Sequence, residues 1–163
     1  MTDTSKRIVV DFMRHGEPEG GDILRGRVDP VLTETGWDQM RRAASLGKLN
    51  SASQQTPNWT EIISSPLKRC CKFAEQTALA VNCLTTIDSQ WQEIDYGDWD
   101  GMLVSEWRKV AAEQFAAFRK NLSALAPPNG EDYLSFKTRV LGAWREILAR
   151  PDGSHLLLSL IHI

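Results

Sequence analysis

The 163-residue sequence lacks any long apolar run. Nowhere does it approach the roughly 18 consecutive apolar residues that suggest a membrane-spanning helix, so we expect no membrane partner. It also lacks a secretory leader, because the apolar residues 8–13 are too few for a signal-peptide core and no cleavage site follows them. We therefore expect a cytoplasmic protein.

An excess of positive charge is also missing. Nineteen Lys and Arg residues stand against 21 Asp and Glu residues, which gives a net charge of -2. Without a global positive field, we expect no binding to nucleic acid or anionic lipid. A composition of 42% hydrophobic and 25% charged residues, with no low-complexity segment, is typical of a folded chain. The length suits one domain, which we expect to span residues 1–163.

Cysteine is scarce and poorly spaced for a structural role. Cys70, Cys71 and Cys83 are odd in number and form no Cys-x-x-Cys pair. Adjacent cysteines rarely bridge each other, and no histidine stands at zinc-ligand spacing. The sequence therefore predicts free thiols, as in a reducing compartment, and no metal site.

Along the sequence, short apolar segments typical of strands alternate with longer segments whose apolar residues recur at helical spacing. The expected strands cover residues 8–13, 60–63, 84–87 and 156–161, and the expected helices 34–49, 66–81, 103–122 and 133–150. Thr33 can cap the first helix, and Ser65 followed by Pro66 predicts the start of the second. The first strand has the apolar composition of a buried strand. This order predicts an α/β fold, with a mostly parallel sheet and helices on both faces.

A first motif, Arg14-His15-Gly16, directly follows the first expected strand. Ligands of open α/β sheets bind beyond the carboxyl ends of strands. A neutral histidine can attack phosphorus through one ring nitrogen, and a neighbouring arginine can donate to two phosphoryl oxygens. A loop histidine held by its neighbours is the alternative interpretation of this tripeptide alone.

A second motif, SSPLKR at residues 64–69, places Arg69 in the first turn of the second expected helix. Helix N-termini favour anions, so Arg69 is well placed to bind a phosphate. A solvated arginine on an exposed helix face is the alternative.

A third motif, EIDYGDWDG at residues 93–101, contains four carboxylates. Among them, Glu93 can protonate a leaving alkoxide. Metal binding is the competing interpretation, but the spacing does not match an EF-hand loop and two aromatic residues interrupt a ring of ligands. We expect Asp95, Asp98 and Asp100 to form turns and caps instead.

Taken together, these motifs resemble the histidine phosphatase superfamily, also called the phosphoglycerate mutase-like family, over essentially the whole chain. Arg14-His15-Gly16 is similar to the family signature, and residues 26–36 to the segment that follows it. Residues 64–69 are similar to its serine-proline-leucine-x-arginine junction, and residues 93–101 to its glutamate-x-x-x-glycine-x-tryptophan-x-glycine stretch. Within the superfamily, the sequence is most similar to bacterial α-ribazole phosphatases.

The resemblance implies that His15 and Glu93 are catalytic and that Arg14 and Arg69 bind the substrate. His15 would accept the phosphoryl group while the two arginines neutralise its oxygens. Glu93 would protonate the departing alcohol and then activate water. The implied partner is a small phosphomonoester, with α-ribazole 5'-phosphate or a sugar phosphate as candidates, and the implied chemistry needs no metal or other cofactor.

The sequence departs from the family pattern near its end. The family has a second histidine, followed by glycine, directly after the last apolar strand, and Leu160 stands at that position here. His162 lies two residues further on and His155 begins the strand. For both of these histidines we favour a structural role.

The family also continues beyond this point with a further helix and strands. We therefore expect a C-terminally truncated or frame-altered domain, with a degenerate relative or a fragment completed by a second chain as the alternatives. An uncovered sheet edge predicts self-association, for example as a homodimer. Whether the phosphatase activity is retained, reduced or lost stays open. A non-catalytic phosphate-binding or regulatory relative is the alternative, and a phosphoglycerate mutase is less favoured because mutases of the family usually carry longer insertions.

Overall fold

The computed structural model of the chain describes residues 6–44 and 57–160. Within them, four parallel strands form one sheet in the order β1-β4-β2-β3. The strands are β1 (Val9–Arg14), β2 (Glu61–Ser64), β3 (Leu84–Ile87) and β4 (His155–Leu160). Because β4 lies between β1 and β2, it joins the two strands whose carboxyl ends lead into the first two motifs.

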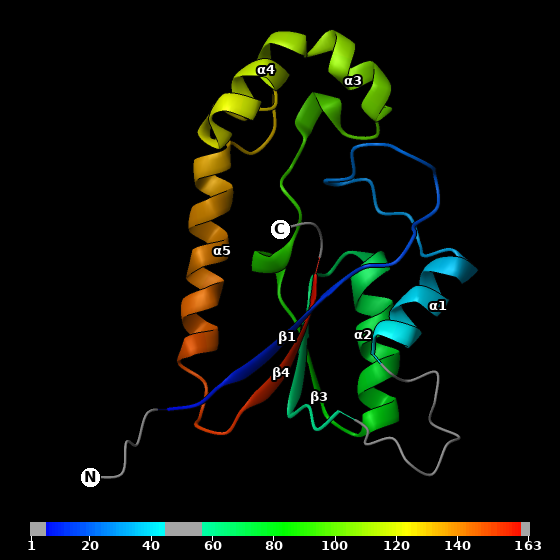
Figure 1. Cartoon of the computed structure of the whole chain (residues 1–163), viewed down its shortest axis with the longest axis vertical. Helices are drawn as coiled ribbons and strands as arrows, with labels where there is room; N and C mark the ends of the chain where they lie inside the picture. The colour runs from blue at the N-terminus through cyan, green and yellow to red at the C-terminus, as the bar shows by residue number, and fades with distance from the viewer. Residues whose placement is uncertain (1–5, 45–56, 161–163) are drawn as a thin grey trace.

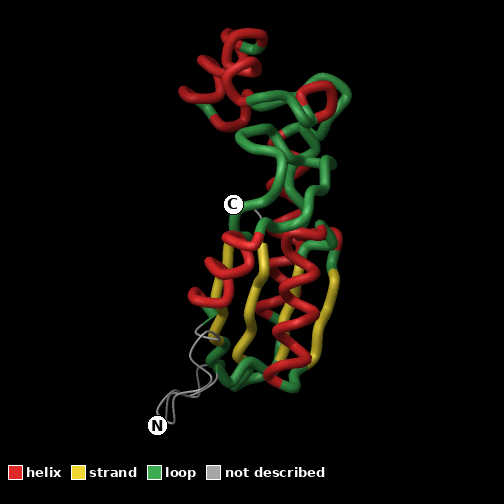
Figure 2. The backbone as a smooth tube through the Cα atoms, turned by 90° about the vertical axis from the view of Figure 1, so that its right-hand side faces the viewer, coloured by secondary structure: helices red, strands yellow, loops and turns green. Residues whose placement is uncertain are grey.

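Helices cover both faces of this sheet (Figure 1). On one face lie α1 (Glu34–Ala43) and α2 (Lys68–Val81), and on the other lies α5 (Tyr133–Leu148). The helices α3 (Val104–Val110) and α4 (Ala112–Lys120) form an excursion beyond the carboxyl ends of the strands, as Figure 2 shows from the side. Three 3-10 turns complete the elements: η2 (Ser89–Trp91), η3 (Gly97–Trp99) and η4 (Leu122–Ala124). The predicted α/β fold is confirmed.

Apolar side chains of β4 hold helices to both faces of the sheet. Leu157 belongs to the cluster with Met40 and Phe73 from α1 and α2, and Leu158 belongs to the cluster with Ile147 from α5. Alternate residues of a strand point to opposite faces, so a strand covered on both faces is apolar throughout. Burying each such side chain contributes about 1.5–3 kcal/mol, which makes β4 the centre of the fold.

The edge strand β1 is less buried than the sequence predicts. Only Met13 of this strand is fully buried, and Phe12 is 60% exposed. Among the described strands β1 pairs with β4 alone, and one side of Phe12 stacks on Trp144 at 5.8 Å between ring centroids. The prediction of a buried strand was wrong here, because apolar composition does not distinguish an edge strand from a central one.

The second helix begins later than predicted. Its N-cap is Leu67, without a side-chain cap, rather than Ser65. The Ser65 N–H donates to the Ser159 carbonyl at 3.2 Å, while its hydroxyl accepts only a long bond of 3.4 Å from the Leu67 N–H. Pairing with β4 therefore extends to Ser65, which moves the helix start to Lys68 and makes Arg69 its second residue.

The helix predicted over residues 103–122 is divided into α3 and α4. Between them Ala111 has φ of -107° and ψ of 33°, although no proline or glycine marks the break. Ala111 is buried in the cluster with Trp107 and Phe115, so both short helices turn an apolar face inward. Residues 45–49 of the first predicted helix lie outside the described residues. Within the described ranges, the helices are too short or too polar to cross a membrane.

Candidate active site

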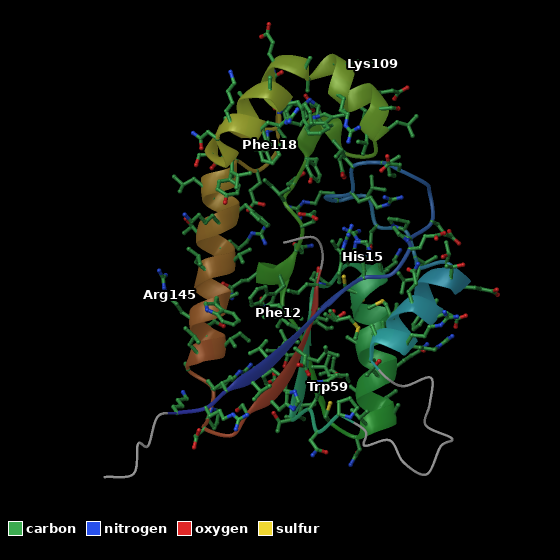
Figure 3. The ribbon with its side chains drawn as sticks, in the orientation of Figure 1. Phe12, His15, Trp59, Lys109, Phe118 and Arg145 are labelled. Atoms are coloured by element: carbon green, nitrogen blue, oxygen red, sulfur yellow. The ribbon has the colours of Figure 1, made fainter. Side chains whose placement is uncertain are left out.

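The first motif lies just beyond the carboxyl end of β1, between the sheet and the α3–α4 excursion (Figure 3). The His15 N–H donates to the Leu160 carbonyl at 3.0 Å, so backbone pairing with β4 continues as far as the histidine. A Cβ on Gly16 would lie 2.1 Å from the Gly36 carbonyl oxygen. Thr33 caps α1 by accepting from the Gly36 N–H at 3.0 Å, as predicted. Close packing of this loop on the start of α1 therefore fixes the backbone around His15.

The half-buried His15 ring is held as a neutral imidazole. Its Nδ1 lies 2.8 Å from the Gly16 carbonyl oxygen. Because a carbonyl only accepts, Nδ1 carries the proton and Nε2 keeps its lone pair. Burial, and then the charges of Arg69, Arg14 and Arg25, lower the pKa of His15 to about 4, against the opposing effect of the bond to Gly16. At pH 7 Nε2 is therefore available as a nucleophile.

Arg69 of the second motif is almost completely buried, with 1% of its surface exposed. Its two terminal nitrogens donate to the carbonyls of Val28 at 3.2 Å and Arg25 at 2.8 Å. Its Nε is buried without a hydrogen-bond partner within the described part of the chain. A buried unpaired donor costs about 1–3 kcal/mol, which favours an anion bound at Arg69. The burial of Arg69 also contradicts the alternative of a solvated arginine on an exposed helix face.

Glu93 of the third motif is half-buried. One of its carboxylate oxygens accepts from the Ile94 N–H at 3.0 Å. The pKa of the Cys70 thiol is raised to about 12, mainly by burial, and the Glu93 charge contributes to this rise. Glu93 is therefore within electrostatic reach of the residue that follows Arg69.

The three aspartates of the third motif organise loops, as predicted. The Asp100 carboxylate accepts from the backbone N–H groups of Gly26 (2.6 Å), Arg27 (2.8 Å) and Val28 (2.6 Å). Asp95 accepts from the Gly97 N–H and pairs with Arg27, while Asp98 accepts from the Asn129 side chain. In the part of the chain that the structure describes, no group of three His, Cys, Asp or Glu side chains is placed to hold a metal ion.

Residues 25–28 connect the second and third motifs. The N–H groups of residues 26–28 donate to the Asp100 carboxylate, and the carbonyls of Arg25 and Val28 accept from Arg69. The charges of Arg14 and Arg69 help to lower the pKa of His15. Arg69 and Asp100 of the third motif bind the same loop. Arg25 is the residue that the sequence did not single out. In the sequence, Arg25 is marked only by its position directly before residues 26–36, the segment similar to the family.

The two histidines near the end of the chain stand apart from this arrangement. His155 lies at the amino end of β4, where its Nε2 is 2.8 Å from an Asp11 carboxylate oxygen. That oxygen also accepts from the Trp59 indole N–H at 2.7 Å, which agrees with a structural role. Leu160 is 2% exposed and packs in the apolar cluster beneath α5. His162 lies outside the described residues.

Comparison with known proteins finds relatives that include proteins named as a phosphoglycerate mutase and a phosphatase. The probable phosphoglycerate mutase GpmB of Proteus mirabilis is 34% identical over 157 residues, which cover 91% of this chain and 67% of that protein. Phosphoserine phosphatase 1 of Hydrogenobacter thermophilus is 32% identical over 141 residues, or 85% of this chain and 64% of that protein. The bifunctional protein Rv2228c of Mycobacterium tuberculosis is 28% identical over 150 residues, and this chain spans 39% of its length.

Solved structures share the fold. The mycobacterial glucosyl-3-phosphoglycerate phosphatase Rv2419c with VO3 superposes with a TM-score of 0.76 at 24% identity, covering 92% of this chain and 74% of that one. Bacillus stearothermophilus YhfR gives 0.77 at 27% identity, covering 96% and 74%. A family model described as the histidine phosphatase superfamily (branch 1) matches residues 10–162. Because that match extends over nearly the whole chain, the protein belongs to the histidine phosphatase superfamily.

Proposed function

We propose that this chain hydrolyses a small phosphomonoester through a phosphohistidine at His15. The observation that carries the proposal is the neutral His15 ring, whose Nδ1 is held by Gly16 amid the positive charges of Arg14, Arg25 and Arg69. Phosphoryl transfer depends mainly on positioning and on stabilising charge at the phosphoryl oxygens. The named relatives, which are phosphatases and mutases, support phosphoryl-transfer chemistry.

The proposed reaction has two steps. In the first, His15 Nε2 forms a bond to phosphorus, the bond from phosphorus to the alcohol oxygen breaks, and Glu93 gives its proton to that oxygen. Arg14 and Arg69 neutralise the non-bridging oxygens. In the second step Glu93 takes a proton from water, the water oxygen attacks phosphorus, and the bond to Nε2 breaks. Inorganic phosphate leaves and His15 is again neutral.

For the substrate we propose α-ribazole 5'-phosphate or a sugar phosphate as candidates. The support is the likeness of the motifs around Arg69 and residues 95–101 to α-ribazole phosphatases. A putative Escherichia coli α-ribazole-5'-P phosphatase shares the fold with a TM-score of 0.72, at 21% sequence identity. Since other relatives act on different phosphate esters, the class of small phosphomonoesters is better supported than either candidate.

Trapping the phosphoenzyme tests the proposal. The chain is incubated with ³²P-labelled acetyl phosphate and quenched in alkali. We expect a label that is stable in alkali, labile in acid and mapped to His15 by mass spectrometry. His15→Ala should abolish the label, whereas His155→Ala, at the opposite end of β4, should retain it. Label on another residue, or label that survives His15→Ala, refutes the proposed nucleophile.

A non-catalytic phosphate-binding protein is the second candidate function. The observation that favours it is the buried Leu160 at the position of the family's second histidine. Such a protein would bind inorganic phosphate in calorimetry but would neither take up label nor hydrolyse 4-nitrophenyl phosphate. A mutase would instead require a bisphosphate primer.

A further inference from the structure

Glu93, the proposed acid and base, lies in irregular backbone between the 3-10 turns η2 and η3. The regular hydrogen bonds of a helix or strand therefore do not fix this part of the chain. One carboxylate oxygen of Glu93 accepts from the N–H of the next residue, Ile94, at 3.0 Å. This contact ties the carboxylate to its own backbone, so whatever holds that backbone also helps to place the carboxylate.

Arg139 of α5 holds the backbone that precedes Glu93. One terminal nitrogen of its guanidinium donates to the carbonyls of Gln90 at 2.9 Å and Gln92 at 3.1 Å. Between these two residues, the buried Trp91 packs in the cluster that α5 forms with the sheet. Both a charged donor and apolar packing therefore attach this backbone to α5, as far as the residue directly before Glu93.

Glu131, the ion-pair partner of Arg139, holds the backbone that follows Glu93. Its carboxylate oxygens accept from Nε of Arg139 at 2.9 Å and from the second terminal nitrogen at 2.6 Å. The Glu131 N–H donates to the Asp95 carbonyl at 2.9 Å, and the Asp95 N–H donates to the Glu131 carboxylate at 3.4 Å. One ion pair is thus attached to the chain on both sides of Glu93.

The geometry of this ion pair suits precise placement. Only 23% of the Arg139 side chain and 19% of the Glu131 side chain are exposed, and the two groups pair through two nitrogens and two oxygens. Such bidentate pairs fix direction as well as distance. Partly buried ion pairs often add little stability compared with apolar residues, so orientation of the bound backbone is the better explanation of this pair.

From these contacts we propose that Arg139 and Glu131 are positioning residues, which hold the Glu93 carboxyl within reach of the leaving oxygen. The inference rests on the proposed function and deepens it. A general acid contributes about 10²–10⁴-fold to a rate, and a misplacement of about 1 Å can cost about 10²-fold. The hydrogen bonds of the described residues do not join this ion pair to His15 or Arg69, so phosphate binding does not require it.

Two phosphate esters with different leaving groups test this inference. Benzyl phosphate releases a strongly basic alkoxide and needs an acid, whereas 2,4-dinitrophenyl phosphate releases a weakly basic phenolate and needs none. The measured quantity is kcat/KM, which covers the steps up to the phosphohistidine. We expect Arg139→Gln to lower it about 10- to 100-fold for benzyl phosphate, but by about threefold or less for the dinitrophenyl ester. Arg145→Gln, which changes an exposed arginine on the outer side of α5 (Figure 3), should alter neither value.

A double-mutant cycle separates positioning from a general structural role. Glu93→Gln should show the same selective loss on benzyl phosphate. Adding Arg139→Gln to Glu93→Gln should then lower kcat/KM no further, because a positioning residue acts only through the group that it positions. Calorimetry should show that Arg139→Gln retains its affinity for inorganic phosphate.

Each other outcome overturns a defined claim. If the wild-type chain hydrolyses neither ester, the proposed function fails and the positioning role fails with it. If it hydrolyses both and Arg139→Gln lowers the two values equally, or the two substitutions are additive, Arg139 serves stability and only the positioning role is overturned. If circular dichroism shows that Arg139→Gln is unfolded, Arg139→Lys replaces it. Lysine keeps the charge, but its single nitrogen cannot span the positions of three guanidinium nitrogens, so the same selective loss is expected and its absence overturns the positioning role.

Discussion

His15 stays neutral because burial and three nearby arginine charges all oppose its protonation. Two of those charges, from Arg14 and Arg69, could be predicted from motifs that follow two parallel strands, whose carboxyl ends lie at the same edge of a sheet. The third could not. The carbonyls of residues 19–23 hold the Arg25 side chain in place, and backbone acceptors leave no pattern in the sequence.

The low pKa of His15 makes stability depend on pH. The unfolded chain, with the ordinary pKa of 6.5, binds more protons than the folded chain between about pH 6.5 and pH 4. The His15 contribution to the free energy of unfolding is therefore complete above pH 6.5 and is lost as the pH falls towards about 4. We expect His15→Gln to flatten the pH dependence in this window, measured by urea unfolding at pH 7, 5.5 and 4.5.

Other titrating groups provide the internal control for that measurement. The pKa of Asp11 is lowered by hydrogen bonds to Trp59 and His155 that outweigh burial, and that of Asp95 by its hydrogen bond to the Gly97 N–H. Their contributions are lost below the ordinary carboxyl pKa of 3.8, and they are the same in both proteins. Parallel curves for the wild-type chain and His15→Gln between pH 7 and 4.5 would show that His15 is not held neutral by the fold.

At the scale of helices and strands, periodicity predicted which faces are buried, and long-range pairing decided where elements begin. Met40 of α1 and Ile147 of α5 are buried against the sheet, because an amphipathic helix turns its apolar stripe towards the core. The start of α2 was predicted wrongly because Ser65 pairs with Ser159, a residue distant in sequence. The exposure of Phe12 likewise depends on which strands adjoin β1, which local sequence does not encode.

The contact between the His15 loop and α1 predicts a strong effect of one methyl group. A Cβ on Gly36 would lie 2.1 Å from the Glu17 carbonyl oxygen, so Gly36→Ala must displace the loop that carries His15. We expect a loss of about 1–3 kcal/mol of unfolding free energy, as for overpacked sites, together with weaker phosphate binding. Chemical denaturation and phosphate titration measure the two effects.

Gly142→Ala is the matched control for this substitution. Gly142 lies inside α5, and an added Cβ would meet only the Gln90 side-chain oxygen at an ordinary 3.5 Å. Since alanine is a better helix former than glycine by about 1 kcal/mol, this variant should be neutral or more stable. A Gly36→Ala protein as stable as Gly142→Ala would contradict the close contact between the loop and α1.

Asp100 provides a second prediction at this scale, because one carboxylate binds three consecutive N–H groups. Asp100→Asn replaces a charged acceptor by a neutral amide that offers a single acceptor oxygen. We expect a loss of about 1–3 kcal/mol and weaker phosphate binding, because residues 26–28 also position the Val28 carbonyl that holds Arg69. Urea unfolding and phosphate titration check both effects. Asp98→Asn, which changes only an exposed contact to Asn129, should leave phosphate affinity unchanged.

At the scale of the whole molecule, the α3–α4 excursion is tied to the loop that carries Arg25. The Leu24 N–H donates to the Met102 carbonyl, and the Gly101 N–H donates to the Leu24 carbonyl, both at 2.9 Å. Val104, the first residue of α3, donates to the Asp22 carbonyl at 3.0 Å. These three bonds attach the start of α3 to residues 22 and 24, which flank Ile23 and directly precede Arg25. Self-association through an uncovered sheet edge stays a prediction.

The last prediction concerns the turnover of the whole chain. The His15 N–H donates to the Leu160 carbonyl at 3.0 Å, so the two residues are neighbours. The Leu160 side chain, however, is buried in the apolar cluster beneath α5. It can neither donate a hydrogen bond nor carry charge. Loss of one preorganised donor typically lowers the rate about 10²–10³-fold. We therefore expect turnover of 4-nitrophenyl phosphate well below about 10 s⁻¹, the median for enzymes, while phosphate binding in calorimetry is retained.

Comparing rate with affinity separates this prediction from a general loss of the pocket. In the proposed mechanism, Arg14, Arg69 and the neutral His15 contact the bound phosphate before any bond breaks, so we expect them to support affinity without a second histidine. A chain that binds phosphate and turns over slowly has kept the ground-state contacts and lost stabilisation of the transition state. Turnover at or above about 10 s⁻¹ would contradict the prediction and require another donor. If that turnover vanished in His162→Ala, His162 would be the substitute, and its imidazole would perform the role that Leu160 cannot.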